Sequence, residues 1–222
     1  MLMEDSRTEV INYAKAMARY PLTVGTSGNV SLREGDRIAI TPSGADYGKL
    51  TPGMITILDL EGNVVEGEWS PSSEVEMHLL IYRETDAAAV LHTHPLYATA
   101  LGLVADETPK VHYMLGLCGG PVRVADYATF GTRELAENMR AAMADRSAVL
   151  LRNHGATCWG RTLEEAFTKT LYLEWCCHLW LVAKSAGNPR LIPDDAFSDA
   201  LVRIGEYGEH RIAGSRMKEA RP

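Results

Sequence analysis

The stretch Val90-Leu91-His92-Thr93-His94-Pro95 sets the architecture of this chain. The run that leads into it, Ala87 to Leu91, is small, apolar and uncharged, which predicts a strand buried on both faces. Side chains two apart on a strand point to the same side, so His92 and His94 should aim at one place. Two neutral imidazoles at the edge of a core suit one divalent metal ion, most often zinc. Two half-buried histidines without a metal fit the same pattern.

A third histidine follows a second buried strand. Ala148 to Arg152 is apolar up to its last residue and continues into Asn153-His154-Gly155. If the two strands finish at the same sheet edge, His154 meets the first pair. Three imidazoles leave a zinc ion one open position for water or substrate, which is the catalytic arrangement. Manganese and cobalt stay open because neutral imidazoles accept several metals. The alternative for His154 is a turn residue bonded only to backbone.

A carboxylate precedes the metal strand. Ser73 and Glu76 have capping-box spacing, which predicts a helix start with Glu74 in the first turn. That helix leads directly into the strand of His92. A carboxylate near a divalent cation can ligate it or act as a base on bound substrate. The alternative is a glutamate that only complements the helix dipole.

Three small polar turns form a plausible anion cradle, because hydroxyls, an amide and backbone N–H groups bind phosphate without net positive charge. They supply Thr26, Gly28, Asn29, Ser43, Gly44, Ser72 and Ser73. The third turn also opens a predicted helix. No Walker lysine or G-x-G-x-x-G motif accompanies them, so a nucleotide is not indicated.

Composition limits the class of protein. A chain of 222 residues that is 46% hydrophobic suits one domain over 1–222, with a polar tail from about residue 208. The formal net charge of −7 argues against a nucleic-acid partner. No uncharged run is long enough for a membrane span, and the four cysteines show no disulfide spacing. We therefore expect a cytoplasmic protein with no membrane partner.

Helices and short strands alternate along the chain, which predicts a layered α/β fold. Helical patterns occupy 4–19, 132–144, 162–186 and 196–204, and a further helix opens at the Ser73 capping box. Strand patterns occupy 30–32, 37–41, 55–59, 64–65, 87–91, 122–124 and 148–152. Thr132 and Thr162 are the expected N-caps of their helices. Residues 103–120 are expected to be irregular.

Seven motifs in order carry a family resemblance that spans about residues 5 to 210. They are Gly25-Thr-Ser-Gly-Asn-Val-Ser31, Ile40-Thr-Pro-Ser-Gly44, Lys49-Leu-Thr-Pro52, Pro71-Ser-Ser-Glu74, His92-Thr-His-Pro95, Tyr127-Ala-Thr-Phe-Gly131 and Asn153-His-Gly155. Together they resemble the class II aldolase/adducin-head family, and its aldolase branch most closely.

The resemblance implies a three-layer α/β/α sandwich around a largely antiparallel central sheet. It implies a homotetramer with one zinc ion per subunit at each subunit interface, and a phosphorylated sugar as partner. The implied reaction is a retro-aldol cleavage of a ketose 1-phosphate, L-fuculose 1-phosphate or a similar one, to dihydroxyacetone phosphate and an aldehyde.

The resemblance also implies site residues. His92, His94 and His154 match the zinc histidines, and Glu74 matches the carboxylate that ligates the resting metal and moves protons. The phosphate pocket would comprise the cradle residues given above. Further matches are Tyr113, which is donated across the interface, Phe130 near the aldehyde, and Tyr207 over the site. Two departures, Cys118 and Trp159, put the aldehyde pocket in doubt.

Several alternatives remain at this point. An L-ribulose-5-phosphate 4-epimerase-type enzyme shares the metal and the retro-aldol step, and a methylthioribulose phosphate dehydratase shares the scaffold. A Schiff-base aldolase would need a desolvated lysine, whereas the lysines here lie mostly on polar stretches. A non-catalytic module like the adducin head would need neither the three histidines nor Glu74.

Overall fold

The computed structural model describes residues 1–207, with the side chains of the last two left out. The expected polar tail from about residue 208 therefore lies outside the described residues. Helices are α1 (Glu4–Arg19), α2 (Val75–Glu84), α3 (Leu96–Gly102), α4 (Arg133–Met143), α5 (Leu163–Ala186) and α6 (Asp194–Tyr207). Strands are β1 (Asn29–Glu34), β2 (Arg37–Ile40), β3 (Thr56–Asp59), β4 (Val64–Glu66), β5 (Ala89–Thr93), β6 (Val124–Ala125), β7 (Ala148–Leu151) and β8 (Gly155–Gly160). Short 3₁₀ turns cover Tyr47–Lys49, Pro52–Met54 and Tyr113–Cys118.

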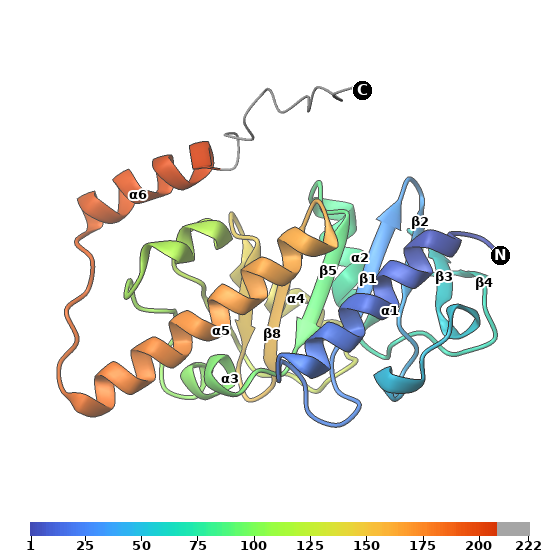
Figure 1. Ribbon diagram of the computed structural model, residues 1–222, viewed down its shortest axis with the longest axis horizontal. Coiled ribbons are helices and arrows are strands. Elements are labelled where there is room, and N and C mark those ends of the chain that lie inside the picture. Colours follow the sequence, from blue (N-terminus) through green and yellow to red (C-terminus); the bar gives the residue numbers. More distant parts are fainter. Residues whose placement is uncertain (208–222) are drawn as a thin grey trace, which may run out of the picture.

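The strands form one sheet in the order β4-β3-β2-β1-β5-β8-β7-β6. Every neighbouring pair is antiparallel except β6 and β7, which run parallel. Helices α1, α3 and α5 cover one face, while α2 and α4 cover the other (Figure 1). The predicted three-layer sandwich with a largely antiparallel sheet is confirmed. All five residues of β5 are buried, as the apolar run predicts for a central strand covered on both faces.

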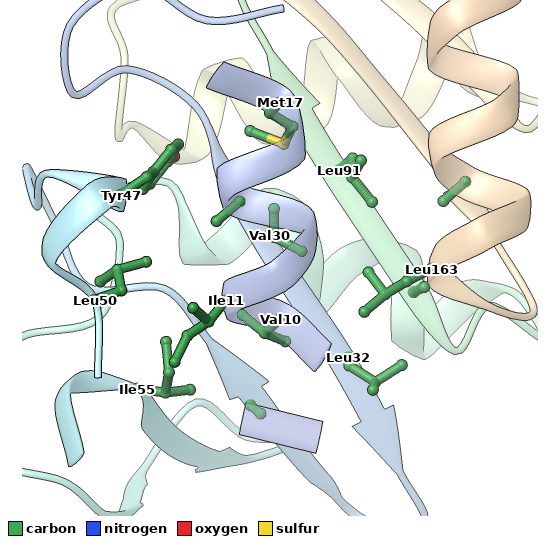
Figure 2. Packing of buried hydrophobic residues seen from close by; sticks show 14 of the residues in the cluster. Val10, Ile11, Met17, Val30, Leu32, Tyr47, Leu50, Ile55, Leu91 and Leu163 are labelled. Atoms are coloured by element: carbon green, nitrogen blue, oxygen red, sulfur yellow. The ribbon is translucent and has the colours of Figure 1, made fainter. Parts of the chain in front are cut away.

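The core follows the helical and strand periodicities of the sequence. In α1 the buried residues Val10, Ile11, Ala14 and Met17 lie at helical spacing and pack against the sheet (Figure 2). On the opposite face, Met139 of α4 joins the cluster over β5 and β7. Both layers pack against the central strands and so position the sheet edge where β5 ends.

Local signals placed most helix ends correctly. Thr132 accepts a hydrogen bond from the backbone N–H of Leu135, and Thr162 accepts one from that of Glu165, so both predicted N-caps are confirmed. The predicted capping box at Ser73 is wrong. Helix α2 begins at Val75, and Glu74 is its N-cap. The Ser72 hydroxyl oxygen accepts a hydrogen bond from the backbone N–H of Glu74, which stabilises a non-helical turn before the helix.

Two elements carried no local signal. Strand β8 follows a tight turn and consists mainly of small residues, yet it is almost fully buried between β5 and β7. Helix α3 lacks an N-cap of its own; the carboxylate of Glu174 in α5 accepts hydrogen bonds from the N–H groups of Tyr97 and Ala98. Both elements depend on partners distant in sequence. Among the described residues, no helix is long and apolar enough to cross a bilayer.

Candidate metal centre

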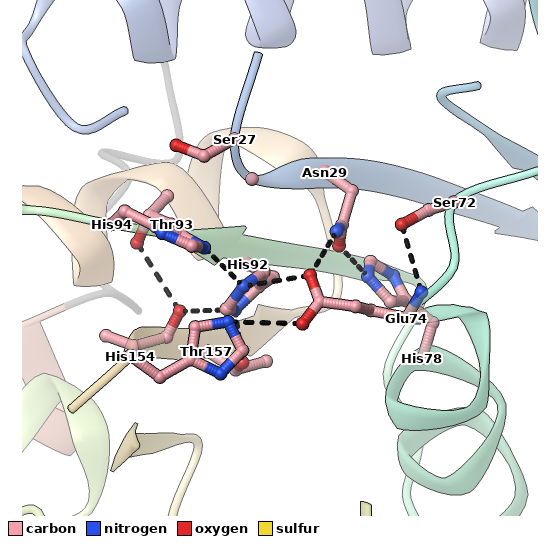
Figure 3. A network of polar contacts seen from close by, with 12 residues as sticks. Ser27, Asn29, Ser72, Glu74, His78, His92, Thr93, His94, His154 and Thr157 are labelled. Carbon is pink, nitrogen blue, oxygen red and sulfur yellow. Dashed lines mark hydrogen bonds and ion pairs between the residues drawn. The ribbon is translucent and has the colours of Figure 1, made fainter. Parts of the chain in front are cut away.

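Four predicted residues converge at the edge of the sheet where β5 ends. One donor atom from each of Glu74, His92, His94 and His154 lies within 4.8 Å of the others. The three imidazole centroids are 4.8 to 4.9 Å apart, and the Nε2 atoms of His92 and His94 are 2.9 Å apart. The Glu74 oxygens lie 3.2 Å from His92 Nε2 and 3.1 Å from His154 Nε2 (Figure 3). These side chains share one centre.

Strand geometry explains the convergence. His92 and His94 are two residues apart, at the end of β5, and point to the same side. Because β8 runs antiparallel between β5 and β7, the end of β7 reaches the same sheet edge and presents His154 there. Gly155 permits the approach, since a Cβ atom at that position would lie 2.2 Å from the carbonyl oxygen of Thr93. Asn153 takes the left-handed conformation, with φ of 57°, that makes the turn tight.

A backbone carbonyl fixes the tautomer of His92. Its Nδ1 lies 3.1 Å from the carbonyl oxygen of Ala156 in β8. A carbonyl can only accept, so Nδ1 carries the ring proton. Nε2 faces the centre and is then the ring nitrogen through which His92 would bind a metal. This is the outer hydrogen bond that metal-ligating histidines typically make.

The centre favours an ionised carboxylate at Glu74. Burial alone would raise the pKa of Glu74, but His92 and His154 act more strongly together and hold that pKa well below its usual range. Burial and the two neighbouring histidines lower the pKa of His94 to about 3. Glu74 is 8% exposed and receives a hydrogen bond of 3.1 Å on Oε2 from Asn29 Nδ2. Within the described chain, Oε1 has no hydrogen-bond partner.

The donor set fits a divalent cation. A buried carboxylate oxygen without a hydrogen bond is costly, as are facing imidazole nitrogens, and a cation among them would satisfy both. Three histidine nitrogens and one carboxylate are ligands that zinc and related transition metals accept. A carboxylate that can leave the metal would open a coordination position.

A cavity of about 310 Å³ adjoins the metal centre and contains the predicted anion cradle. Its lining includes the whole predicted set: Thr26, Gly28, Asn29, Ser43, Gly44, Ser72 and Ser73. Among the described residues, no lysine or arginine lines it. An anion there would therefore be held by hydroxyl and N–H groups near the start of α2, whose dipole is positive at this end.

The other side of the cavity is less polar. Tyr127, Ala128 and Phe130 line it, together with Asn153. Phe130 is 67% exposed and Tyr127 is 59% exposed, so both rings are free to cover a ligand in the cavity. The cavity thus has an end rich in hydroxyl groups, a metal centre, and an aromatic end.

Other predicted residues lie elsewhere. Tyr113 is half exposed in the 3₁₀ turn and does not line this cavity. Tyr207 ends α6, and its side chain lies outside the described residues. Trp159 lines a separate cavity, Cys118 is buried in the core, and neither lines the cavity at the metal centre.

A Schiff-base mechanism needs a buried lysine, and among the described residues Lys169 is the buried one. Lys169 is 7% exposed, but its ammonium lies 2.6 Å from a Glu165 oxygen and donates to the carbonyl of Trp159. These contacts occupy the ammonium group, and Lys169 lines the cavity of Trp159, not that of the metal centre. The Schiff-base alternative has no suitable lysine among the described residues.

The sequence analysis did not select Ala128, Asn153, Tyr127 or His78, which lie at or next to this site. Tyr127 stood inside the quoted motif Tyr127-Ala-Thr-Phe-Gly131, of which only Phe130 was selected. His78 contacts the amide of Asn29 and is fully buried. Its signal was its spacing of four residues from Glu74, which places both side chains on one face of the helix.

Comparisons with known proteins agree with this geometry. The chain matches the family described as class II aldolase and adducin N-terminal domain over residues 8–181. It is 41% identical over 212 residues to the 5-deoxy-D-ribulose 1-phosphate aldolase of Bacillus thuringiensis serovar kurstaki, covering 94% of this chain and 100% of that protein.

Two further relatives cover nearly the whole chain. The 5-methylthioribulose-1-phosphate/5-deoxyribulose-1-phosphate aldolase of Rhodospirillum rubrum is 36% identical over 206 residues, which are 92% of this chain and 93% of that protein. A solved structure of L-fuculose 1-phosphate aldolase is 40% identical, with a TM-score of 0.89 over 92% of this chain and 98% of the other.

Proposed function

The chain belongs to the class II aldolase and adducin N-terminal domain family, and from that membership we propose that it is a zinc-dependent lyase for a ketose 1-phosphate. Its products would be dihydroxyacetone phosphate and an aldehyde. One observation supports this above all: a Glu-His₃ donor set shares a cavity with a cradle of hydroxyl and N–H groups.

The proposed metal residues are His92, His94, His154 and Glu74. A divalent cation bound there supplies Lewis acidity, which stabilises negative charge developing on a substrate oxygen. Glu74 would accept and return the proton at the carbon next to the carbonyl. It is buried, and its Oε1 makes no hydrogen bond within the described chain, so a lone pair of this oxygen is free for the proton.

The phosphate anchors the substrate at the other end of the cavity. Ser43, Ser72, Ser73 and Thr26 offer hydroxyl donors, and α2 begins beside them. Binding the non-reacting phosphate fixes the distance between the reacting carbon and Glu74. Such anchoring lowers the entropic part of the barrier.

The substrate proposed here has an apolar terminal carbon. Tyr127, Ala128 and Phe130 offer no charged group to the far end of the cavity. The relatives act, by their names, on fuculose, 5-deoxyribulose and 5-methylthioribulose phosphates, which all end in a methyl group. We infer that 5-deoxyribulose 1-phosphate, which yields acetaldehyde, is preferred to ribulose 1-phosphate, because a terminal methyl group gains from contact with the ring of Phe130 and with Ala128, whereas a terminal hydroxyl loses hydration there.

The proposal also includes an oligomer with shared sites. Tyr113 is half exposed and does not line the cavity of its own subunit. As the proton donor to the aldehyde-side oxygen, it would reach the site only from a neighbouring copy. A phenol O–H group can donate a proton and suits that role. A homotetramer with sites between subunits satisfies this requirement.

A substrate panel tests the proposal. Purified enzyme is incubated with 5-deoxyribulose, fuculose and ribulose 1-phosphates, and released dihydroxyacetone phosphate is measured with a coupled dehydrogenase. We expect release from the first two and at least about tenfold lower kcat/KM for the third. A pentulose phosphate of inverted configuration, formed from L-ribulose 5-phosphate, would identify an epimerase instead. Full activity after dialysis against EDTA would exclude the metal.

A further inference from the structure

A row of buried polar side chains continues behind Glu74, away from the cavity. It consists of Asn29, His78, Ser31 and Tyr82, none more than 2% exposed. The strand and helix spacings place these side chains in one line. Positions 29 and 31 are two apart on β1, and positions 74, 78 and 82 are four apart along α2. Figure 3 shows its first members, Asn29 and His78, next to Glu74.

Consecutive hydrogen bonds connect this row to the carboxylate. Asn29 Nδ2 donates to Glu74 Oε2 at 3.1 Å, and Asn29 Oδ1 contacts His78 Nε2. His78 Nδ1 lies 2.6 Å from the hydroxyl oxygen of Ser31, which lies 2.6 Å from that of Tyr82. The proposed reaction uses neither His78 nor Tyr82, although both are costly to bury.

The direction of each hydrogen bond follows from its partners. The ionised carboxylate can only accept, so the Asn29 amide turns its N–H group to Glu74 and its carbonyl to His78. That carbonyl requires a proton on His78 Nε2. Burial lowers the pKa of His78 to about 3, so the ring has one proton and Nδ1 must accept. Ser31 then donates to Nδ1, and Tyr82 donates to Ser31.

We propose that His78 is a positioning residue: by holding the Asn29 amide in one orientation, it keeps Glu74 Oε2 as a hydrogen-bond acceptor and leaves Oε1 to carry the reacting proton. This inference rests on the proposed function of Glu74. Oε2 receives the Asn29 N–H group, whereas Oε1 has no hydrogen bond within the described residues. Oε1 faces His154 Nε2 at 3.1 Å, so proton uptake at Oε1 leaves the Asn29 hydrogen bond to Oε2 intact.

Loss of the ring N–H of His78 would free the amide of Asn29. The amide could then turn over and present its carbonyl oxygen to the carboxylate, where two acceptors repel each other. His78→Phe keeps a ring of similar size but removes both hydrogen bonds. His78→Gln retains an N–H group that reaches the Asn29 carbonyl. The two variants separate loss of the hydrogen bond from loss of volume.

Kinetics form the first half of the test. We expect His78→Phe to lower kcat about 10- to 100-fold with KM changed less than about threefold, and His78→Gln to recover most of that loss. His178→Phe, a change of the same type on α5 outside the row, serves as the control. Equal kcat in His78→Phe and wild type would overturn the proposal, and so would equal losses in both folded His78 variants.

Histidine ¹⁵N resonances of the metal-free wild-type protein form the second half and need no substrate. His78→Gln assigns the signal. We expect a neutral ring with its proton on Nε2, slow exchange of that proton, and no change on titration from about pH 8 to about pH 5. A proton on Nδ1, or a charged ring in that range, would overturn the proposal. Failure of the wild type to cleave any ketose 1-phosphate would refute the proposed function alone.

Discussion

At the scale of single residues, the role proposed for Glu74 is the most specific. Glu74→Gln preserves shape and one oxygen but removes the base, so exchange of the carbon-bound proton of dihydroxyacetone phosphate into deuterated water should fall about 10²- to 10⁴-fold. The three histidines remain, and we expect metal still to be bound. Proton exchange is followed by NMR and metal by elemental analysis; undiminished exchange would remove Glu74 from the base role.

The metal residues allow a separate prediction. His154→Ala removes one of three imidazoles, leaving Glu74 Oε1 beside an empty volume. We expect bound metal to fall from about one per chain to well below half after dialysis, because each ligand contributes much of the affinity. His112→Ala is the control, since His112 lies in the turn before Tyr113, outside the donor set. Equal metal content in both variants would contradict the assignment.

At this scale the sequence predicted the candidate metal-donor residues better than the residues that hydrogen-bond to them. The spacing of His92 and His94 required a common direction, and the structure has it. The contacts of Asn29 with Glu74 and His78 were not predicted, because they join β1 to α2 across the core. A pattern within one element indicates a face, but the partner on that face depends on tertiary packing.

At the scale of elements, the turn between β7 and β8 brings His154 to the other histidines. Gly155→Ala would place a Cβ atom 2.2 Å from the carbonyl of Thr93, so β8 must move away from β5. We expect a loss of about 1–3 kcal/mol in the free energy of unfolding and about tenfold weaker metal binding.

Gly53→Ala provides the matched control for that change. A Cβ atom there meets nothing within 4 Å, so its effect should stay within about 0.5 kcal/mol. Urea denaturation and metal titration measure the two quantities. Unchanged metal affinity in Gly155→Ala would show that the approach of these strands does not position His154.

Elements were predictable where their ends carry local signals. Thr132 and Thr162 cap α4 and α5 with their own side chains, so both helix starts were predicted correctly. Helix α3 is capped by Glu174, 77 residues from the Tyr97 N–H group that it binds, and β8 is held by its neighbours in the sheet. Long-range contacts of this kind leave no periodicity in the sequence.

At the scale of the whole molecule, burial of His78 links stability to pH. Its pKa is about 3 in the folded chain and about 6.5 when exposed, so between these values the unfolded chain binds more protons. This contribution is complete above about pH 6.5 and declines as pH falls, by about 2 kcal/mol between about pH 7 and about pH 5. Urea unfolding at both pH values should show a smaller decline in His78→Gln. Equal declines would mean that His78 does not remain neutral.

A composite active site makes a sharper prediction about the assembly. Glu74 and His154 lie in one subunit, whereas Tyr113 would come from its neighbour. Glu74→Gln and Tyr113→Phe should each be nearly inactive alone. In a randomly mixed ring, about a quarter of the sites combine an intact Glu74 with an intact Tyr113, so co-refolding equal amounts should restore about a quarter of wild-type activity.

The matched control for that experiment mixes Glu74→Gln with His154→Ala. Both residues belong to the same subunit's half of the site, so every site in the mixture lacks one of them and no activity should return. Recovery in the first mixture alone would place Tyr113 across a subunit interface. Recovery in neither mixture, with both oligomers intact, would mean that each chain completes its own site, and Tyr113 would lose its role as proton donor.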